Sequence, residues 1–275
     1  MLYYKIVMNL IPKKIHWCWL SGDPLPPVIQ SCIKSWKRVM PDYEFILWDM
    51  KRFDIHSVPY VEQACAARKW ACASDYIRWF ALYTEGGIYL DSDVKVFRRF
   101  DKFLKHRAFF STLKWDLAMP GERLGKQNWI EAECFGAEKG HPLMKCCMDV
   151  YENAVFQLVN NVVTVGMAPV VLSNACTTFG WNNNTKINQP LILKEGVVIY
   201  PEEYFPSYLC KLSFFHTYAI HLSTVSWYDR TDLKNDFLLP LRKWHNKMIF
   251  NYWWFKRLHS KRKKIQKKII GFFKR

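Results

Sequence analysis

The chain has 275 residues and a mass of 32.8 kDa, a length that suits one large domain or one domain with an appendage. Hydrophobic residues make up 50% of it and charged residues 23%, which excludes an intrinsically disordered protein. The net charge is +16, but residues 241–275 hold 13 Lys and Arg and no acidic residue. The first 240 residues carry 27 basic and 24 acidic residues, a balance that disfavours a nucleic-acid-binding core.

The cysteines and the apolar segments indicate a cytosolic protein. Nine Cys are present, with no CxxC pair and no Cys and His at zinc spacing, so we expect reduced thiols. No apolar stretch reaches the roughly 18 residues needed to cross a bilayer. The N-terminal residues 1–11 are apolar but too short for a cleaved secretory signal, so none is expected.

The first fifth of the chain predicts a strand, a helix and a second strand. Residues 14–20 form a nearly continuous apolar run, and residues 43–48 form another. Between them, residues 28–39 place their apolar side chains on one helical stripe, and Pro41 ends it. This order is typical of an α/β fold with a parallel sheet.

A third unit leads to an acidic sequence. Ser74 is placed to cap a helix that runs to about Tyr83, and Gly86-Gly87 ends that helix. Residues 88–90 then form a strand that ends at Asp91-Ser92-Asp93, and residues 94–97 continue as a short extended piece.

The remaining elements have weaker patterns. We expect strands at 106–112, 130–137 and 197–200, and helices at 142–159 and 169–178. The composition changes near Pro240, which predicts a catalytic domain over residues 1–240 and a basic tail over 241–275.

Asp91 and Asp93 lie directly after an apolar strand. On a strand, positions i and i+2 share a face, and the carboxyl end of such a strand opens onto the ligand crevice of an α/β sheet. Two carboxylates this close resist ionising together unless a cation lies between them. The pair therefore predicts a Mn²⁺ or Mg²⁺ site, with a solvated turn as the alternative.

Asp75 and Arg78 are three residues apart on the preceding helix, so they lie on one face of it. They could join the acidic pair in one site. The alternative is an ordinary ion pair on a helix surface.

Together these segments closely resemble the DxD region of glycosyltransferase family 32, which includes yeast mannosyltransferases, α-1,4-galactosyltransferases and bacterial capsule and O-antigen enzymes. They also resemble the clostridial glucosylating toxins. The resemblance is specific over about residues 11–100, is patchier to about 230 and does not cover the basic tail. It is carried by Ile11 to Gly22, Ser35-Trp36, Pro41 to Glu44, Leu47 to Asp49, Ala73 to Arg78, Leu82-Tyr83 and Gly86 to Asp93.

The resemblance implies a GT-A fold, a nucleotide-sugar-binding α/β domain with a mixed, mainly parallel sheet. Asp75 and Arg78 would hydrogen-bond the donor sugar. Asp91 would contact sugar or ribose and reach the metal through water, and Asp93 would bind the metal directly. Tyr89 and Ser92 belong to the same donor-binding segment.

Four further contacts to the donor or its metal are implied by the resemblance. Trp19 matches the aromatic residue that stacks on the nucleobase in the toxins, with core packing as the alternative reading. His221 begins the closing segment and is a candidate third metal or diphosphate contact, while Ser226 and Trp227 would hold the β-phosphate. The segment Gly166-Met167-Ala168-Pro169 departs from the Gly-Pro dipeptide that is usual in the family.

The leading interpretation is a retaining glycosyltransferase that moves a hexose from a nucleotide-sugar, with UDP favoured, to a lipid-linked glycan. No residue stands out as a covalent nucleophile, so attack on the same face, assisted by the leaving phosphate, is the mechanism considered. Two alternatives are a toxin-like enzyme that glycosylates a host protein and a nucleic-acid-binding protein that uses the tail.

The tail predicts a membrane contact. Its apolar residues recur at helical spacing among Lys and Arg, a pattern typical of a helix that lies in a membrane interface. We therefore expect a cytoplasmic enzyme that is peripheral on the inner face of a bacterial membrane and binds anionic lipid through residues 241–275. A solvated basic tail and a nucleic-acid arm are the alternatives. The apolar positions are Trp254, Leu258, Ile265, Ile269, Phe272 and Phe273.

Overall fold

The computed structural model describes residues 10–114, 128–159, 162–207 and 216–224. The chain divides into two compact units, Met1–Leu222 and Ser223–Arg275. Every helix and strand of the described residues belongs to the first unit. The predicted tail helix, the predicted boundary at residue 240, and the residues Ser226 and Trp227 lie outside the described residues.

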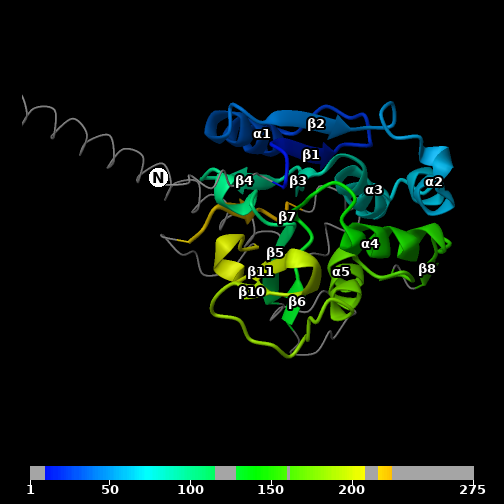
Figure 1. The fold of residues 1–275 in the computed structure, drawn as a ribbon. Coiled ribbons are helices and arrows are strands. Elements are labelled where there is room, and N and C mark those ends of the chain that lie inside the picture. Colours follow the sequence, from blue (N-terminus) through cyan, green and yellow to red (C-terminus); the bar gives the residue numbers. More distant parts are fainter. Residues whose placement is uncertain (1–9, 115–127, 160–161, 208–215, 225–275) are drawn as a thin grey trace, which may run out of the picture. The chain divides into compact units, whose positions relative to one another are not determined.

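The core of the first unit is a mixed sheet with the strand order β10-β11-β5-β7-β3-β1-β2, which runs from the bottom to the top of Figure 1. Strands β2, β1, β3, β5 and β11 run in one direction, and β7 and β10 run against them. The predicted mixed, mainly parallel sheet is therefore confirmed. The strands are β1 (Lys14–Cys18), β2 (Glu44–Trp48), β3 (Gly87–Leu90), β5 (Ala108–Lys114), β7 (Cys134–Ala137), β10 (Leu191–Ile192) and β11 (Val197–Tyr200), with β6 (Asn128–Ile130) pairing beside β5.

Two small ribbons accompany the sheet. Strand β4 (Val94–Val96) pairs antiparallel with β12 (Ala219–His221), and β8 (Leu158–Val159) pairs with β9 (Val162–Val163). The first ribbon matters for function because it begins directly after Asp93 and brings a distant part of the chain beside it.

The helices are α1 (Pro27–Val39), α2 (Pro59–Ala66), α3 (Trp70–Glu85), α4 (Pro142–Glu152) and α5 (Ala168–Thr177), with short 3-10 turns at Ile55–Ser57, Asp101–Phe103, Lys194–Gly196 and Glu202–Tyr204. Helix α3 packs on β1, β3 and β7, and α2 and α4 flank it.

Helices α1 and α3 cover opposite faces of the sheet. Trp17 meets Trp36 of α1 edge to face at 5.9 Å, whereas the next residue, Cys18, lies near Tyr89, whose ring is covered by Arg78 of α3. Because successive strand residues point to opposite faces, these two contacts assign one helix to each side.

Several predicted boundaries are wrong. Helix α3 begins at Trp70, so Ser74 lies inside it and donates to the Ala71 carbonyl at 2.7 Å instead of capping it. Helix α2, which begins with Pro59 in its first turn, was not predicted, because its apolar pattern is short. The predicted helix over 142–159 ends at Glu152. The predicted strand over 130–137 is two strands, β6 and β7, interrupted at residues 131–133.

The connection from α3 to β3 needs its two glycines. Gly86 and Gly87 have φ of 68° and 127°, in the left-handed region that side chains disfavour. A Cβ on Gly86 would lie 2.7 Å from the Lys139 backbone nitrogen, and one on Gly87 would lie 2.9 Å from the Lys14 carbonyl oxygen. The turn therefore packs backbone against backbone directly before the strand that leads to Asp91.

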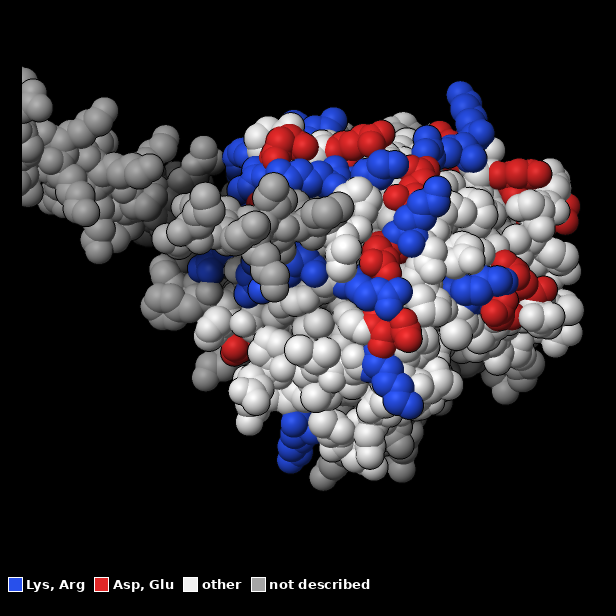
Figure 2. Space-filling view, in the orientation of Figure 1, with Lys and Arg blue, Asp and Glu red and all other residues white. Residues whose placement is uncertain are grey.

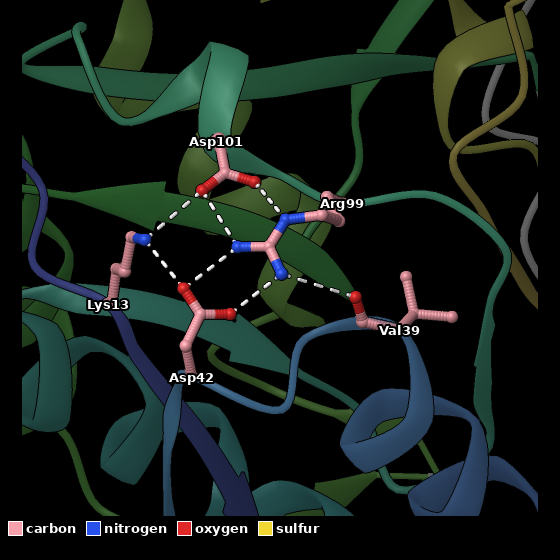
Figure 3. Close-up of polar contacts among 5 residues, drawn as sticks. All are labelled: Lys13, Val39, Asp42, Arg99 and Asp101. Atoms are coloured by element: carbon pink, nitrogen blue, oxygen red, sulfur yellow. Dashed lines mark hydrogen bonds and ion pairs between the residues drawn. The ribbon is translucent and has the colours of Figure 1, made fainter.

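An exposed network of four charges ties together three segments at the other end of the sheet (Figure 3). Arg99 binds Asp42 at 2.7 Å and Asp101 at 2.6 Å, and Lys13 binds Asp42 at 2.6 Å. The hydrogen bonds from Arg99 and Lys13 hold the pKa of Asp42 well below its usual range. Because salt screens exposed ion pairs of this kind, the network holds the three segments together locally but contributes little to the free energy of unfolding.

On the face drawn in Figure 2, basic and acidic side chains lie intermixed, without a stripe of one sign. This agrees with the near balance of charge in the first 240 residues. Among the described residues, no helix is both long enough and apolar enough to cross a membrane.

Candidate active site

The site residues gather at the carboxyl end of the parallel strands. Strands β1 and β3 are parallel neighbours, so Trp19 after β1 and Asp91 after β3 lie at the same edge. Helix α3 precedes β3 and runs antiparallel to it, and a tight turn joins the two. The N-terminal half of α3, with Asp75 and Arg78, therefore lies at the same end as Asp91.

Asp91-Ser92-Asp93 is a tight turn that follows β3, so the two carboxylates do not share one strand face as we expected. The Val94 N–H donates to the Asp91 carbonyl at 3.0 Å, which closes the turn between β3 and β4. As a result the two carboxylates have different partners: Asp91 lies 3.5 Å from Arg78, and Asp93 lies 3.0 Å from His221.

Arg78 is the buried centre of the donor-side cluster, with 5% of its surface exposed. Its Nη2 lies 2.8 Å from the Asp75 carboxylate, and its Nη1 donates to the Ala132 carbonyl at 2.6 Å. Its Nε donates to the Ser74 carbonyl at 3.3 Å, and Tyr89 lies against its guanidinium at 4.9 Å from the ring centroid. The guanidinium is thus fixed in place and holds two carboxylates, Asp75 and Asp91.

The Asp75 carboxyl is a buried group with a raised pKa. Burial raises its pKa to about 6 and the Asp91 charge adds to this, while Arg78 and the backbone N–H of Ala168 oppose the shift. Ala168 is the first residue of α5. The loop at residues 166–169 lacks the Gly-Pro dipeptide that is usual in the family, but it still places a backbone N–H beside Asp75. Burial likewise raises the pKa of Asp91, against the attraction of Arg78 and His221.

His221 reaches the acidic turn because β12 pairs with β4. In the ladder His221 is opposite Val94, the residue after Asp93, and the Leu222 N–H donates to the Asp93 carbonyl at 3.2 Å. The His221 Nε2 lies 3.0 Å from the Asp93 carboxylate, and its Nδ1 lies 3.0 Å from Glu133. Burial alone would lower the pKa of His221, but these two carboxylates raise it well above its usual value.

The structure brings Asp75, Arg78, Asp91, Asp93 and His221 together. Trp19 lies at the same edge, is half-buried and donates from Nε1 to the Asp23 carbonyl at 2.8 Å. Tyr89, which we expected to bind the donor, is 1% exposed beneath Arg78, so it acts on the site through that guanidinium.

The sequence reasoning missed Glu131 and Glu133. Both are close to the acidic turn, because β7 runs antiparallel to β3 and Glu133, just before β7, falls opposite Asp91, just after β3. The signal was available: Glu131-Ala132-Glu133 is a second pair of carboxylates at i and i+2 beside a buried strand.

The described residues contain no preformed group of three His, Cys, Asp or Glu side chains arranged to hold a metal ion. The donor chemistry nevertheless fits a hard divalent cation, because Asp91 lies within electrostatic reach of two further carboxylates, Asp93 and Glu133. Two protein carboxylates with open positions are the arrangement that Mg²⁺ and similar ions use when phosphates complete the coordination.

Comparison with known proteins gives relatives that transfer sugars. Over 138 residues the chain is 30% identical to inositol phosphoceramide mannosyltransferase 3 of Schizosaccharomyces pombe, which covers 49% of this chain and 35% of that protein. Over 114 residues it is 31% identical to mannosyl phosphorylinositol ceramide synthase CSH1 of Saccharomyces cerevisiae, covering 39% and 29%. The chain thus spans about a third of the length of these relatives.

Among solved structures, the PaToxG glycosyltransferase aligns with a TM-score of 0.45 at 21% identity, over 61% of this chain and 69% of that one. A glycosyltransferase involved in glycosylation of the major capsid of PBCV-1 aligns with a TM-score of 0.43 at 10% identity, over 77% and 93%.

The family comparison covers more of the chain than the two yeast relatives do. The model of the family described as "Capsular polysaccharide synthesis protein" matches residues 3–161, more than half of the chain, and includes the whole segment from β1 to the acidic turn. Together with the mannosyltransferase relatives, this match confirms the resemblance recognised in the sequence. The chain belongs to the capsular polysaccharide synthesis protein family.

Proposed function

We propose that the protein is a metal-dependent, retaining glycosyltransferase that moves a hexose from a UDP-sugar to a lipid-linked glycan. The observation that carries the proposal is the buried cluster at the end of β3, where Arg78 binds Asp75 and Asp91 while His221 binds Asp93. Family membership and the mannosyltransferase relatives support transfer of a sugar.

In this proposal the carboxylates serve different parts of the donor. Asp75, held by Arg78 and the Ala168 N–H, accepts hydrogen bonds from sugar hydroxyls. Asp91 binds sugar or ribose, and Trp19 stacks on the base. The Arg78 guanidinium holds the Asp75 and Asp91 carboxylates in fixed positions, because its other N–H groups donate to the Ser74 and Ala132 carbonyls. Placing reactants in this way contributes to catalysis without any new bond to the protein.

A divalent ion fits the acidic turn. Asp93 would bind Mn²⁺ or Mg²⁺ directly, Asp91 through water, and His221 would stand beside the diphosphate. When bound, the ion supplies positive charge to the departing diphosphate oxygens. His221 would serve the same end, since its Nε2 lies 3.0 Å from Asp93 and its Nδ1 lies 3.0 Å from Glu133, which favours a positively charged ring.

The transfer breaks the bond between the anomeric carbon and the diphosphate oxygen and forms a bond to an acceptor oxygen on the same face. The acceptor proton passes to the departing phosphate oxygen. The carboxylates of Asp75, Asp93 and Glu133 are each engaged with Arg78 or His221, which favours this route over covalent attack by one of them.

We further propose that the protein works at the inner face of a bacterial membrane, where a lipid-linked acceptor would lie. The support is the composition of residues 241–275, which combine 13 Lys and Arg with regularly spaced apolar residues.

The test is sugar-nucleotide hydrolysis or transfer by variants of the acidic turn. Asp93→Ala and Asp91→Asn should each lower kcat by about a hundredfold or more, since one well-placed charge contact is worth that much in a transition state. Glu44→Gln, an exposed acid on β2, is the matched control. Near wild-type turnover by either variant, or full activity in excess EDTA, contradicts the metal role.

A further inference from the structure

Glu131, Ala132 and Glu133, the three residues between β6 and β7, contact both halves of the buried cluster. The Ala132 carbonyl accepts from Arg78 Nη1 at 2.6 Å, and the Glu133 carbonyl accepts from the Asp91 N–H at 2.8 Å. The Glu133 carboxylate lies 3.0 Å from His221 Nδ1. The segment therefore reaches the donor-side cluster through its backbone and the Asp93 side through a side chain.

The segment is itself anchored to the sheet through Ser111 of β5. The Glu131 N–H donates to the Ser111 carbonyl at 2.9 Å, and the Ser111 hydroxyl donates to Glu131 Oε2 at 2.8 Å. Glu131 and Ser111 have no exposed surface. The position of the Glu131 side chain is therefore set by the central strand β5 and not by a surface loop.

The carboxyl groups of Glu131 and Glu133 lie within interaction distance of each other. Glu131 Oε1 and Glu133 Oε2 are both buried and have no hydrogen-bond partner among the described residues, a situation that protonation of one carboxyl group would relieve if it donated to the other. The described chain of contacts is then continuous from Ser111 through Glu131, Glu133 and His221 to Asp93.

We propose that Glu131-Ala132-Glu133 is the positioning segment of this site: Glu133 orients the His221 ring so that Nε2 faces Asp93, and Glu131 holds Glu133 in place. What the oriented ring does in turnover rests on the proposed function, but the orientation itself does not. A stabilising role is the poorer explanation, because burying two carboxyl groups is usually less favourable than burying apolar side chains of the same volume.

The decisive variant is Glu133→Gln, which keeps the size of the side chain and removes the charge that faces His221 Nδ1. Glu131→Gln should have a smaller effect than Glu133→Gln, because the amide N–H of the new side chain can still donate to Glu133. Glu138→Gln is the matched control: Glu138 follows the far end of β7 and binds Arg107 at 2.6 Å, away from the acidic turn.

Orientation is read directly in metal-free protein labelled with ¹⁵N-histidine, using His221→Asn to assign the ring signals. Glu133→Gln should shift both ring-nitrogen signals of His221, Glu131→Gln should shift them less, and Glu138→Gln should leave them in place. In turnover assays Glu133→Gln should lower kcat/KM by about 10- to 100-fold, as removal of a partner that orients a site histidine does.

The outcomes separate the two proposals. If Glu133→Gln leaves the His221 signals where Glu138→Gln leaves them, the positioning role is wrong, whatever the activity. If its activity loss only follows a fall in the unfolding midpoint, the segment is structural and the inference fails. If Asp93→Ala stays active, the proposed function fails, while the histidine spectra still decide whether Glu133 orients the ring.

Discussion

At the scale of single residues, the fold holds one histidine neutral by the way its two ring nitrogens are bonded. His16 has no exposed surface; its Nε2–H donates to the Gly86 carbonyl at 2.9 Å, and its Nδ1 accepts from Trp48 Nε1 at 3.0 Å. A second ring proton would face the Trp48 donor. Burial accordingly lowers the pKa of His16 to about 4, with the Gly86 bond opposing the shift.

This shift predicts a loss of stability in acid. The unfolded chain takes up the proton near pH 6.5 and the folded chain only near pH 4, so the contribution of His16 is complete above about pH 6.5 and is lost as the pH falls toward 4. The loss should be about 3 kcal/mol of unfolding free energy over that window. His16→Gln should remove it, as measured by denaturant unfolding at pH 7 and pH 4.5.

Asp75 titrates in the same window with the opposite sign. Because the folded-state pKa of its carboxyl is raised to about 6, protonation below that pH favours the folded chain. The comparison is therefore made in an Asp75→Asn background. If Asp75→Asn and the double variant Asp75→Asn with His16→Gln lose the same unfolding free energy between pH 7 and pH 4.5, the buried histidine is not the source of the loss.

Trp19 gives a second prediction at this scale. It is half-buried, whereas Trp17 and Trp36 are core residues, so its ring has a face that a nucleobase can cover. Trp19→Ala should weaken UDP binding by roughly 1–3 kcal/mol, the usual contribution of one stacked base, and Trp19→Phe should restore part of it. Calorimetry with UDP measures the effect. Unchanged affinity together with a lower unfolding midpoint would assign Trp19 to the core.

At the scale of elements, the glycine turn between α3 and β3 decides whether the site is assembled at all. It sets the path along which the helix bearing Asp75 and Arg78 returns beside the strand bearing Asp91. The sequence predicted this turn correctly from Gly86-Gly87. The close approach of the Lys139 backbone is a tertiary contact that no local pattern contains.

The prediction is that Gly86→Ala destabilises the fold more than a control at another left-handed glycine. Gly140 has φ of 75° but open space around its Cβ position. Gly140→Ala should therefore lower the free energy of unfolding by about 1–2 kcal/mol, the cost of placing a side chain in the left-handed region. Gly86→Ala adds the clash with the Lys139 nitrogen. Denaturant midpoints of the two variants test this, and equal losses would mean that the strand shifts without cost.

At the scale of the whole molecule, the charge is distributed very unevenly. Residues 241–275 carry nearly all of the net positive charge, while the body mixes both signs. Each Lys or Arg near an anionic membrane surface contributes about 1 kcal/mol of attraction, which falls with ionic strength.

We therefore predict that the full chain sediments with anionic vesicles and that high salt releases it. Truncation after Leu239 should abolish sedimentation and slow transfer to a membrane-embedded acceptor while sparing hydrolysis of the free donor. Neutral phosphatidylcholine vesicles are the control for charge. Equal sedimentation of the truncated protein would remove the tail as the membrane anchor, and binding of duplex nucleic acid by the tail at the same salt would favour the alternative partner.

The sequence by itself determined the α/β class and the elements β1, α1, β2, α3 and β3, though not α2, because local periodicity marks them. Its acidic motif and the family resemblance also singled out Asp75, Arg78, Asp91, Asp93 and His221 as candidate site residues, which the fold brings together. It shows a second pair of carboxylates in Glu131-Ala132-Glu133, but it does not tell that they lie beside the acidic turn or that the chain breaks between β6 and β7. Their meaning depends on which strands become neighbours: the antiparallel pairing of β7 with β3 and of β12 with β4 brings residues more than 40 and more than 120 positions apart into contact. Strand neighbours of that kind are chosen by packing of the whole sheet, and only the tertiary structure decided them.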